Sequence, residues 1–227
     1  MSQRVIFFDI DGTLLASGGA GQKAMELTLT EEFRISFPFE GVLTAGRTDF
    51  GIVTEIFDRY DIAHTDEERS RFQQAYLERL PHCLESLDGL LLPGIVELLQ
   101  TLSGRPELVL ALLTGNYSEG AWIKLRHFQL DHHFEFGGFG DRHANRDDVA
   151  SAACEAAQKV LNRPISGRNC CVVGDTPADI QCARSIDADI VAVATGAYSA
   201  EELKPHEPDH LFVDLSDTRA AAAAIAG

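Results

Sequence analysis

The sequence of 227 residues predicts an α/β protein with a doubly wound parallel sheet and a helical segment inserted after the first strand. Three observations support this fold class. The run Val5–Phe8 is apolar without interruption, which is typical of a strand buried on both faces of a sheet. Apolar spacing between residues 22 and 87 is helical only. From Leu90 onward strands and helices alternate, which implies right-handed crossovers between parallel strands.

The first strand ends in the tetrad Asp9-Ile10-Asp11-Gly12. Side chains alternate along a strand, so Ile10 separates two carboxylates that face the same way. Ligands of parallel sheets bind beyond the carboxyl ends of the strands, which is where these two acids fall. Two carboxylates this close repel each other unless a cation lies between them, and hard oxygen ligands favour Mg²⁺. Taken alone, the tetrad fits equally well a plain turn whose acids accept hydrogen bonds from backbone amides.

The inserted segment follows a break of small residues at 16–21, which is typical of a hinge. Apolar residues then recur at helical spacing, as at Phe72 and Tyr76, and no strand of comparable strength interrupts them. Pro81 and the break at 87–89 mark the expected end of this segment. An all-helical block after a single strand does not fit a simple alternating chain. We therefore predict a core of residues 1–17 and 88–227 and an inserted α-helical domain of residues 18–87.

The second part of the chain supplies the remaining strands and helices of the core. The expected strands are 108–113, 134–136, 170–173, 189–193 and 211–213. The expected helices run from Pro93-Gly94 to about residue 102, over 121–128, over 147–161, after Asp179 and through the Ala-rich tail 220–226.

The composition narrows the range of partners. With 35 Asp and Glu against 19 Lys and Arg, the formal net charge is −16, and this field repels nucleic acid and anionic membrane surfaces. No apolar run approaches the ~18 residues of a membrane span, and the few residues before Val5 leave no room for a leader. The five cysteines are scattered and odd in number, as expected of reduced thiols in the cytoplasm. We expect a cytoplasmic monomer or homodimer.

Three predicted strands end in residues suited to handling a phosphoryl group. The first ends in Asp9 and Asp11, the second in Thr114-Gly115-Asn116, and the third in Asp175 with Asp179 one turn later. A carboxylate can attack phosphorus and form an aspartyl-phosphate, and Asp9 is the candidate nucleophile. A second carboxyl, Asp11, would protonate the leaving alkoxide and later deprotonate the attacking water.

The remaining groups of the expected site bind the phosphoryl oxygens and the metal. Thr114 offers a hydroxyl, and the following helix start offers backbone N–H groups. Asp175 and Asp179 would complete an oxygen shell around Mg²⁺ together with Asp9 and the backbone carbonyl of Asp11. Arg146, before a predicted helix, is the candidate phosphate-binding cation.

The motifs Asp9-x-Asp11-Gly12-Thr13, Leu113-Thr114-Gly115-Asn116 and Gly174-Asp175-x-x-x-Asp179 resemble the first, second and fourth motifs of the haloacid dehalogenase-like superfamily. The resemblance implies a Rossmann-like core, a helical cap inserted after the first motif, and an Mg²⁺-dependent phosphatase that works through an aspartyl-phosphate. Within the superfamily the chain resembles the phosphoglycolate-phosphatase-like group, whose cap carries a stretch similar to Gly46-Arg47-Thr48. The resemblance implies that substrate is bound by Thr13, Thr114, Gly115, Asn116, Arg47 and Arg146.

One family feature is missing, because no Lys-Pro pair precedes the helix expected at 147–161. Arg146 resembles the arginine that some branches of the family use there. Lys124 and Lys159 are the alternatives, and for both a solvated helix face is the commoner explanation.

The expected reaction is hydrolysis of a small-molecule phosphate monoester. A phosphomutase shares every core motif and remains an alternative, as does a signalling module in which Asp9 accepts a phosphoryl group without turnover. Glycolate phosphate, a sugar phosphate and a nucleotide all remain open as substrates, because specificity would reside in the inserted segment.

Overall fold

The computed structural model describes residues 3–227 and contains a six-stranded parallel sheet. The order of the strands changes direction at β1, as in a doubly wound sheet, and the predicted fold class is confirmed. In sheet order the strands are β5 (Gly137–Gly138), β4 (Leu108–Leu113), β1 (Arg4–Phe8), β6 (Cys170–Gly174), β7 (Asp189–Val193) and β8 (His210–Phe212).

Helices cover both faces of the sheet. They are α4 (Ile95–Ser103), α5 (Ser118–His127), α6 (Arg146–Leu161), α7 (Pro177–Ser185), α8 (Ala200–Leu203) and α9 (Thr218–Ala226), with short 3₁₀ turns η1 (Asp131–His133), η2 (Gly167–Asn169) and η3 (Lys204–His206). Ile6 and Phe8 of β1 pack on the face covered by α4, α5 and α9, whereas Val5 and Phe7 pack under α6 and α7. Alternating side chains of one strand thus enter two different cores, which explains why this strand is apolar without interruption.

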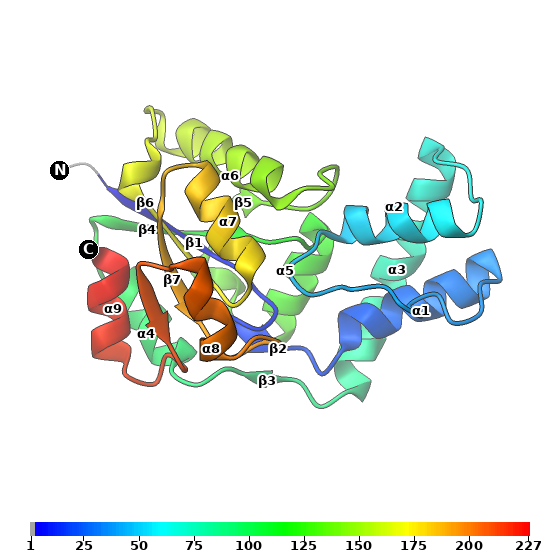
Figure 1. Ribbon diagram of the computed structural model, residues 1–227, viewed down its shortest axis with the longest axis horizontal. Coiled ribbons are helices and arrows are strands. Elements are labelled where there is room, and N and C mark those ends of the chain that lie inside the picture. Colours follow the sequence, from blue (N-terminus) through cyan, green and yellow to red (C-terminus); the bar gives the residue numbers. More distant parts are fainter. Residues whose placement is uncertain (1–2) are drawn as a thin grey trace.

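Three further helices, α1 (Ala20–Phe33), α2 (Asp49–Arg59) and α3 (Asp66–Ser86), form the inserted segment. Figure 1 shows them gathered at one end of the molecule, with the C-terminus at the opposite end. They share a hydrophobic core of their own, in which Phe72 and Tyr76 of α3 stack with ring centroids 6.2 Å apart. Tyr117, at the start of α5, also packs into this core. The helical character predicted for this segment is confirmed.

Two stretches of chain connect the inserted segment to the part that contains the sheet, one before α1 and one after α3. Each contains a two-residue strand, and these strands, β2 (Leu15–Ala16) and β3 (Leu90–Leu91), pair antiparallel. The sequence gives little sign of this pair, because two residues per strand are too few for a recognisable period. These two strands lie beside the predicted domain limits of 17 and 87. The division into core and inserted domain stays a prediction, and residues 1 and 2 of that core lie outside the described part of the chain.

Two local predictions were wrong. The strand expected at 134–136 is Gly137–Gly138, because Phe134 and Phe136 insert into the two cores while the glycines pair with the end of β4. Pro81 does not mark the end of the helical segment, since α3 continues through it to Ser86. The remaining boundaries differ from those expected by three residues or fewer, apart from the unplaced start of the final helix.

Candidate active site

Asp9 follows β1 directly and is one of three buried acids that converge at the carboxyl ends of the strands. Its backbone N–H donates to Val173 of β6 over 3.0 Å, which fixes the chain at this point. Asp9 is only 5% exposed. One carboxylate oxygen each from Asp9, Asp175 and Asp179 lies within 4.8 Å of the other two. The sequence prediction that these acids meet at the strand ends is confirmed in its geometry.

Two glycines make room for the carboxylate of Asp175. Gly12 has a φ of +87°, and a Cβ there would lie 2.4 Å from Asp175 Oδ2. A Cβ at Gly196 would lie 1.7 Å from the same oxygen. Thr13 donates to Asp175 Oδ1 over 3.2 Å from a fully buried position. Thr13, expected to bind substrate, therefore orients one of the three acids.

Asp179 is held by the first turn of α7. Thr176 and Asp179 form a reciprocal capping box, in which Asp179 Oδ2 accepts from the Thr176 N–H and hydroxyl over 2.9 and 2.7 Å. These bonds occupy one oxygen of the carboxylate. The other, Oδ1, accepts a hydrogen bond from Arg146.

Arg146 is the first residue of α6 and reaches two acids at once. The Asn145 side chain caps this helix by accepting from the Asp147 N–H. Arg146 Nη2 lies 3.3 Å from Asp9 Oδ1, in an ion pair without hydrogen-bond geometry, and also pairs with Asp179. With 6% exposure, the guanidinium is shielded from solvent.

The charge balance of this acid cluster favours a bound cation. Burial, together with the charges of Asp179 and Asp11, raises the pKa of Asp9 to about 6 despite Arg146. Burial and repulsion by Asp179 and Asp9 raise the pKa of Asp175 to about 9. Asp9 Oδ1 is buried without a hydrogen-bond partner among the described residues. An orphaned carboxylate oxygen beside two further acids fits a divalent cation with hard oxygen ligands.

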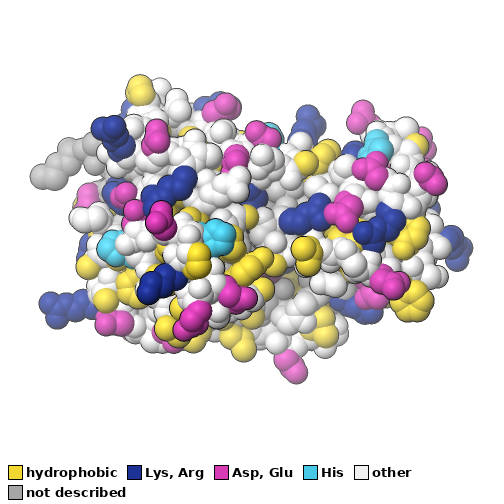
Figure 2. All heavy atoms as spheres, in the orientation of Figure 1, with side chains coloured by type: hydrophobic (Ala, Val, Ile, Leu, Met, Phe, Trp, Pro, Cys, Tyr) yellow, Lys and Arg dark blue, Asp and Glu magenta, His cyan; other side chains and the backbone are white. Residues whose placement is uncertain are grey.

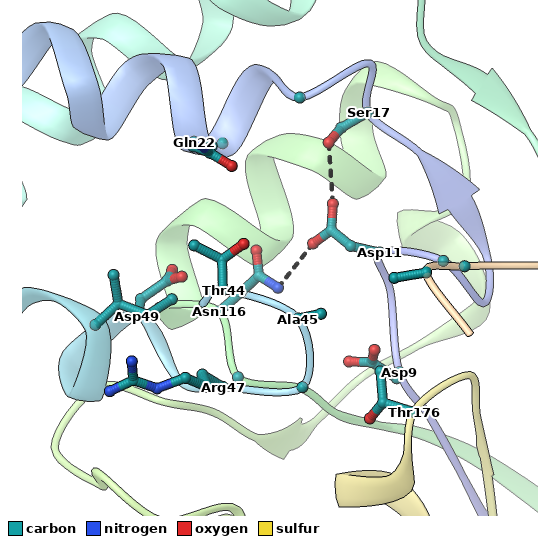
Figure 3. A pocket seen from close by; sticks show the side chains of 18 of the residues that line it. Asp9, Asp11, Ser17, Gln22, Thr44, Ala45, Arg47, Asp49, Asn116 and Thr176 are labelled. Carbon is teal, nitrogen blue, oxygen red and sulfur yellow. Dashed lines mark hydrogen bonds between the residues drawn. The ribbon is translucent and has the colours of Figure 1, made fainter. Parts of the chain in front are cut away.

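Asp11 has different surroundings, although it is only two residues away. Its Oδ1 accepts from Ser17 over 3.0 Å, and its Oδ2 accepts from Asn116 Nδ2 over 2.9 Å and from Lys124 Nζ over 2.5 Å. Burial opposes ionisation of this carboxyl, but the charge of Lys124 and the hydrogen bonds outweigh it and lower the pKa of Asp11. Figure 3 shows Ser17 and Asn116 on either side of the Asp11 carboxylate. The Asp11 side chain is not part of the three-acid cluster.

Lys124 is a site residue that the sequence interpretation did not favour. It was expected on a solvated helix face, but it is 4% exposed, since it lies on the buried side of α5 with Gly120, Ala121 and Leu125. This spacing is the signal in the sequence, because a lysine at i+3 from Ala121 and beside Leu125 falls within the apolar stripe of the helix. Lys159 is exposed on α6, as expected.

The end of β4 supplies residues that hold one another in place. Thr114 is fully buried, and its hydroxyl accepts from the Asn116 N–H and Nδ2 over 3.3 and 2.9 Å. Asn116 does not cap a helix, since the N-cap of α5 is Tyr117. The Asn116 amide instead joins Thr114 to Asp11. Gly115 packs directly under the inserted segment, where a Cβ would lie 2.2 Å from the Arg47 carbonyl oxygen.

A cavity of about 300 Å³ lies between the strand ends and the inserted segment. Residues of α1, α2, α3 and the loop before α2 line it on one side. The strand ends, α5 and the start of α6 line the other side with Asp9, Asp11, Asp175, Asn116, Lys124 and Arg146. Figure 3 shows Arg47 extending past Asp49, with its guanidinium remote from Asp9 and Asp11. The Arg47 guanidinium binds the Glu55 carboxylate over 2.5 Å and the carbonyls of Leu43 and Gly51 over 3.2 Å each. Arg47 thus lines the cavity, but its N–H groups donate to acceptors within the inserted segment.

Two further cavity residues were not singled out from the sequence. Asp49 is 8% exposed, and its Oδ2 accepts from the Tyr117 N–H over 2.8 Å. Burial raises the pKa of Asp49 to about 7, although Lys124 and the Tyr117 N–H oppose this. Tyr76 of α3 is fully buried, and its hydroxyl has no hydrogen-bond partner among residues 3–227. Neither residue lies in a strand-end motif, so no local pattern marks them.

Comparisons with known proteins agree with this architecture. Residues 3–187 match the family model of haloacid dehalogenase-like hydrolases. A probable phosphatase of Dickeya dadantii (strain 3937), IndB, is 25% identical over 227 residues, covering 97% of this chain and 94% of the relative. The structure of a hydrolase from Pseudomonas syringae has a TM-score of 0.72 and 24% identity, covering 99% of this chain and 100% of that one. A predicted phosphoglycolate phosphatase from Haemophilus somnus has a TM-score of 0.68 and 19% identity, covering 97% and 98%.

The two structural similarities establish the fold, while the family match establishes the relationship. It spans β1, the inserted helices, and the ends of β4 and β6, which carry all three acidic and polar motifs. The protein belongs to the haloacid dehalogenase-like hydrolase family and, as predicted, is a hydrolase.

Proposed function

We propose that this protein is an Mg²⁺-dependent phosphatase that hydrolyses a small-molecule phosphate monoester through an aspartyl-phosphate on Asp9. The observation that carries the proposal is the buried cluster of Asp9, Asp175 and Asp179 beside Arg146, with Asp11 at the same strand end. One acid can serve as nucleophile while the others bind a cation, and Asp11 stays free of the cluster for proton transfer.

In the first half of the reaction, an Asp9 carboxylate oxygen forms a bond to phosphorus as the bond from phosphorus to the ester oxygen breaks. Asp11 is ionised beside Lys124 in the free protein, so it first takes up a proton from solvent when the substrate binds. It then gives this proton to the ester oxygen, an alcohol leaves, and Asp9 carries the phosphoryl group. In the second half, Asp11 takes a proton from water as the water oxygen attacks phosphorus. Phosphate leaves and the Asp9 carboxylate is regenerated.

Charge that gathers on the phosphoryl oxygens needs donors already in place. Arg146 lies closest to the nucleophile, at 3.3 Å from Asp9 Oδ1, and we propose that it binds a phosphoryl oxygen. The Thr114 hydroxyl and the amides of Gly115 and Asn116 are the proposed partners at the end of β4. Asn116 and Lys124 hold Asp11 in position to reach the ester oxygen.

The proposed metal ligands are the side chains of Asp9, Asp175 and Asp179 and the backbone carbonyl of Asp11. A bound Mg²⁺ would neutralise part of the charge on the acids and on the phosphoryl oxygens. The cavity supports a small substrate, because about 300 Å³ is near the lower end of ligand pockets. We propose that the inserted segment acts as the cap of the family and covers the cavity. The phosphoglycolate-phosphatase-like subgroup and a cytoplasmic location remain part of this proposal.

Neither a membrane nor nucleic acid is supported as a partner. Among the described residues, no helix is long and apolar enough to cross a membrane. Figure 2 shows Lys and Arg side chains interspersed with Asp and Glu over the visible face, without a continuous basic patch. This agrees with a small-molecule substrate rather than nucleic acid.

The test is phosphate release from a panel of small phosphate monoesters with Mg²⁺, repeated with EDTA. We expect turnover that EDTA abolishes and that excess Mg²⁺ restores. Turnover that survives EDTA would remove the metal from the proposal, and no release from any ester would remove the phosphatase.

The same assay distinguishes the two alternatives. A phosphomutase would convert a sugar phosphate into its isomer without releasing phosphate. A signalling module would accumulate phosphorylated Asp9 that persists after the donor is removed, whereas a phosphatase with Asp11 in place turns the intermediate over.

A further inference from the structure

The cavity has a second end, formed by the inserted segment, which the phosphoryl chemistry does not use. Assuming the phosphatase activity proposed above, we infer that the leaving group of the substrate is an uncharged alcohol with a further hydroxyl group, which hydrogen-bonds to the Tyr76 hydroxyl. The site would then select a phosphate of a small diol or polyol over a phosphate of a hydroxy acid such as glycolate.

The Tyr76 hydroxyl is a buried polar group to which a ligand could hydrogen-bond. The residue is fully buried and lines the cavity, yet its hydroxyl has no partner among the described residues. A buried hydroxyl without a hydrogen bond costs free energy, because it has lost its bonds to water. A hydroxyl of the leaving group would satisfy it, since an alcohol both donates and accepts.

Space next to this hydroxyl is kept free by two glycines. A Cβ at Gly120 of α5 would lie 3.3 Å from Tyr76 Oη. A Cβ at Gly21 of α1 would lie 3.9 Å from the same oxygen and 3.3 Å from Lys124 Nζ. A side chain at either position would contact the Tyr76 hydroxyl, and Gly21 lines the cavity together with Tyr76 and Lys124.

Every cation that lines the cavity is already paired with an acid. Lys124 binds Asp11, Arg47 binds Glu55, and Arg146 binds Asp9 and Asp179. A carboxylate on the leaving group would need one of these pairs to break. Lys124 and Arg146 are buried, so breaking either pair leaves an uncompensated charge, which is strongly unfavourable. The Arg47–Glu55 pair is half-exposed, but Arg47 would also have to release two backbone carbonyls.

Asp49 adds an acid to the same wall. It lines the cavity in the inserted segment, 8% exposed, with one oxygen bound to the Tyr117 N–H. Its raised pKa reflects burial that Lys124 and this N–H do not overcome. An anionic leaving group would meet repulsion from the ionised form, whereas a hydroxyl can donate to it. The apolar lining of Met25, Phe39 and Ile52 suits the carbon chain of an alcohol.

Four two-carbon esters test the inference on the wild-type protein, because they differ at one position only. 2-Hydroxyethyl phosphate carries a hydroxyl, ethyl phosphate a hydrogen, phosphoglycolate a carboxylate and phosphoethanolamine an ammonium group. We expect kcat/KM to be highest for 2-hydroxyethyl phosphate, about tenfold or more above ethyl phosphate, with phosphoglycolate lowest. A higher kcat/KM for phosphoglycolate or phosphoethanolamine than for 2-hydroxyethyl phosphate would overturn the inference.

Two variants test the residues. Tyr76→Phe removes only the hydroxyl, so the preference for 2-hydroxyethyl over ethyl phosphate should fall about tenfold. Tyr60→Phe, at the exposed tyrosine that follows the last residue of α2, is the matched control and should keep the wild-type preference. Asp49→Asn keeps an acceptor for the Tyr117 N–H but removes the charge, so phosphoglycolate should gain relative to 2-hydroxyethyl phosphate. Equal loss on all four esters in Tyr76→Phe would contradict the inference.

The outcomes separate this inference from the proposed function. If none of the esters, including p-nitrophenyl phosphate, releases phosphate, the phosphatase proposal fails and the leaving-group inference fails with it. If phosphate is released with another order of preference, only the inference about Tyr76 fails. The wild-type ranking decides this without any variant, so a folding defect in Tyr76→Phe does not protect the inference.

Discussion

Asp9 and Asp11 stand two residues apart at one strand end, but their surroundings differ in kind. Asp9 belongs to a cluster of three carboxylates with a single guanidinium, and its pKa is raised. Asp11 is bound by Lys124, Asn116 and Ser17, and its pKa is lowered. Asp9 follows β1 directly and Asp11 comes only two residues later, so strand position alone does not determine their ionisation. The partners supplied by the ends of the other strands and by α5 determine it.

The Asp9 cluster has more negative charge than Arg146 can balance, which favours a divalent cation there. The Asp11 group is balanced by Lys124 and needs no metal. In the proposed mechanism, two residues thus separate a metal-binding nucleophile from a proton-transfer group. Each of the following predictions alters one side of this comparison and leaves the other in place.

Substitution of the nucleophile gives the largest expected effect. Asp9→Asn keeps the size of the side chain but removes the attacking oxygen charge, so kcat should fall by roughly 10⁴-fold or more. Phosphate release from 2-hydroxyethyl phosphate measures this, with the melting temperature as a check on folding. A kcat within tenfold of the wild type would mean that Asp9 is not the nucleophile.

The loss of kcat on substitution of Asp11 should depend on the leaving group of the ester. Asp11→Asn cannot donate or accept the proton, so kcat for an alkyl phosphate should fall by ~10² to 10⁴. The loss on p-nitrophenyl phosphate should be smaller, because nitrophenolate leaves without protonation. Equal losses on both esters would argue against Asp11 as the general acid.

Removal of the partner of Asp11 should have an intermediate effect. Lys124→Met preserves the packing of the buried stem but removes the charge, so Asp11 loses its strongest bond and kcat should fall about tenfold. Lys159→Met, on the exposed face of α6, is the matched control and should stay within about twofold of the wild type. The assignment of Lys124 would be wrong if the two variants behaved alike.

The smallest expected effect is a pH dependence of the melting temperature when metal is removed. Folding raises the pKa of Asp175 from 3.8 to about 9, so the folded state holds a proton that the unfolded state releases. In EDTA, the melting temperature should therefore fall as pH rises from about 5 to 8. Mg²⁺ should reduce this slope, and Asp175→Asn should flatten it, because the amide has no proton to lose. A wild-type melting temperature that rises over this range would contradict the charge balance described here.

The sequence was enough to predict the Asp9 side of the comparison but not the Asp11 side. Asp9 and Asp175 each follow a buried strand directly, and Asp179 lies one helical turn after Asp175. Parallel strands bring their ends together, so local patterns predict where these acids meet. Asp11 also lies at a strand end, but its partner Lys124 lies within a helix, where the same residue type is commonly solvated. Only the packing of α5 against the sheet and α3 places Lys124 at this carboxylate.

The far end of the cavity was the least predictable. Tyr76 fits the apolar period of α3 and gives no sign that its hydroxyl faces a cavity. Asp49 is the first residue of α2, a position where acids are common because of the helix dipole. Arg47 was expected to bind substrate from its resemblance to a family motif, whereas its donors are bonded to Glu55 and to carbonyls of the same segment. These contacts depend on how the inserted segment closes over the strand ends, which no single stretch of sequence encodes.

The most direct test of the central claim is to trap the phosphoenzyme. The protein is mixed with 2-hydroxyethyl phosphate and Mg²⁺, quenched in acid within milliseconds to seconds, digested and analysed by mass spectrometry. We predict one phosphoryl group on the peptide that contains Asp9 and none in Asp9→Asn. In Asp11→Asn we predict more of it than in the wild type when p-nitrophenyl phosphate is the substrate, because nitrophenolate leaves without an acid and only the proton transfer from water in the second step is lost. Turnover by the wild-type protein without a phosphorylated Asp9, or with the phosphoryl group on another residue, would contradict the account.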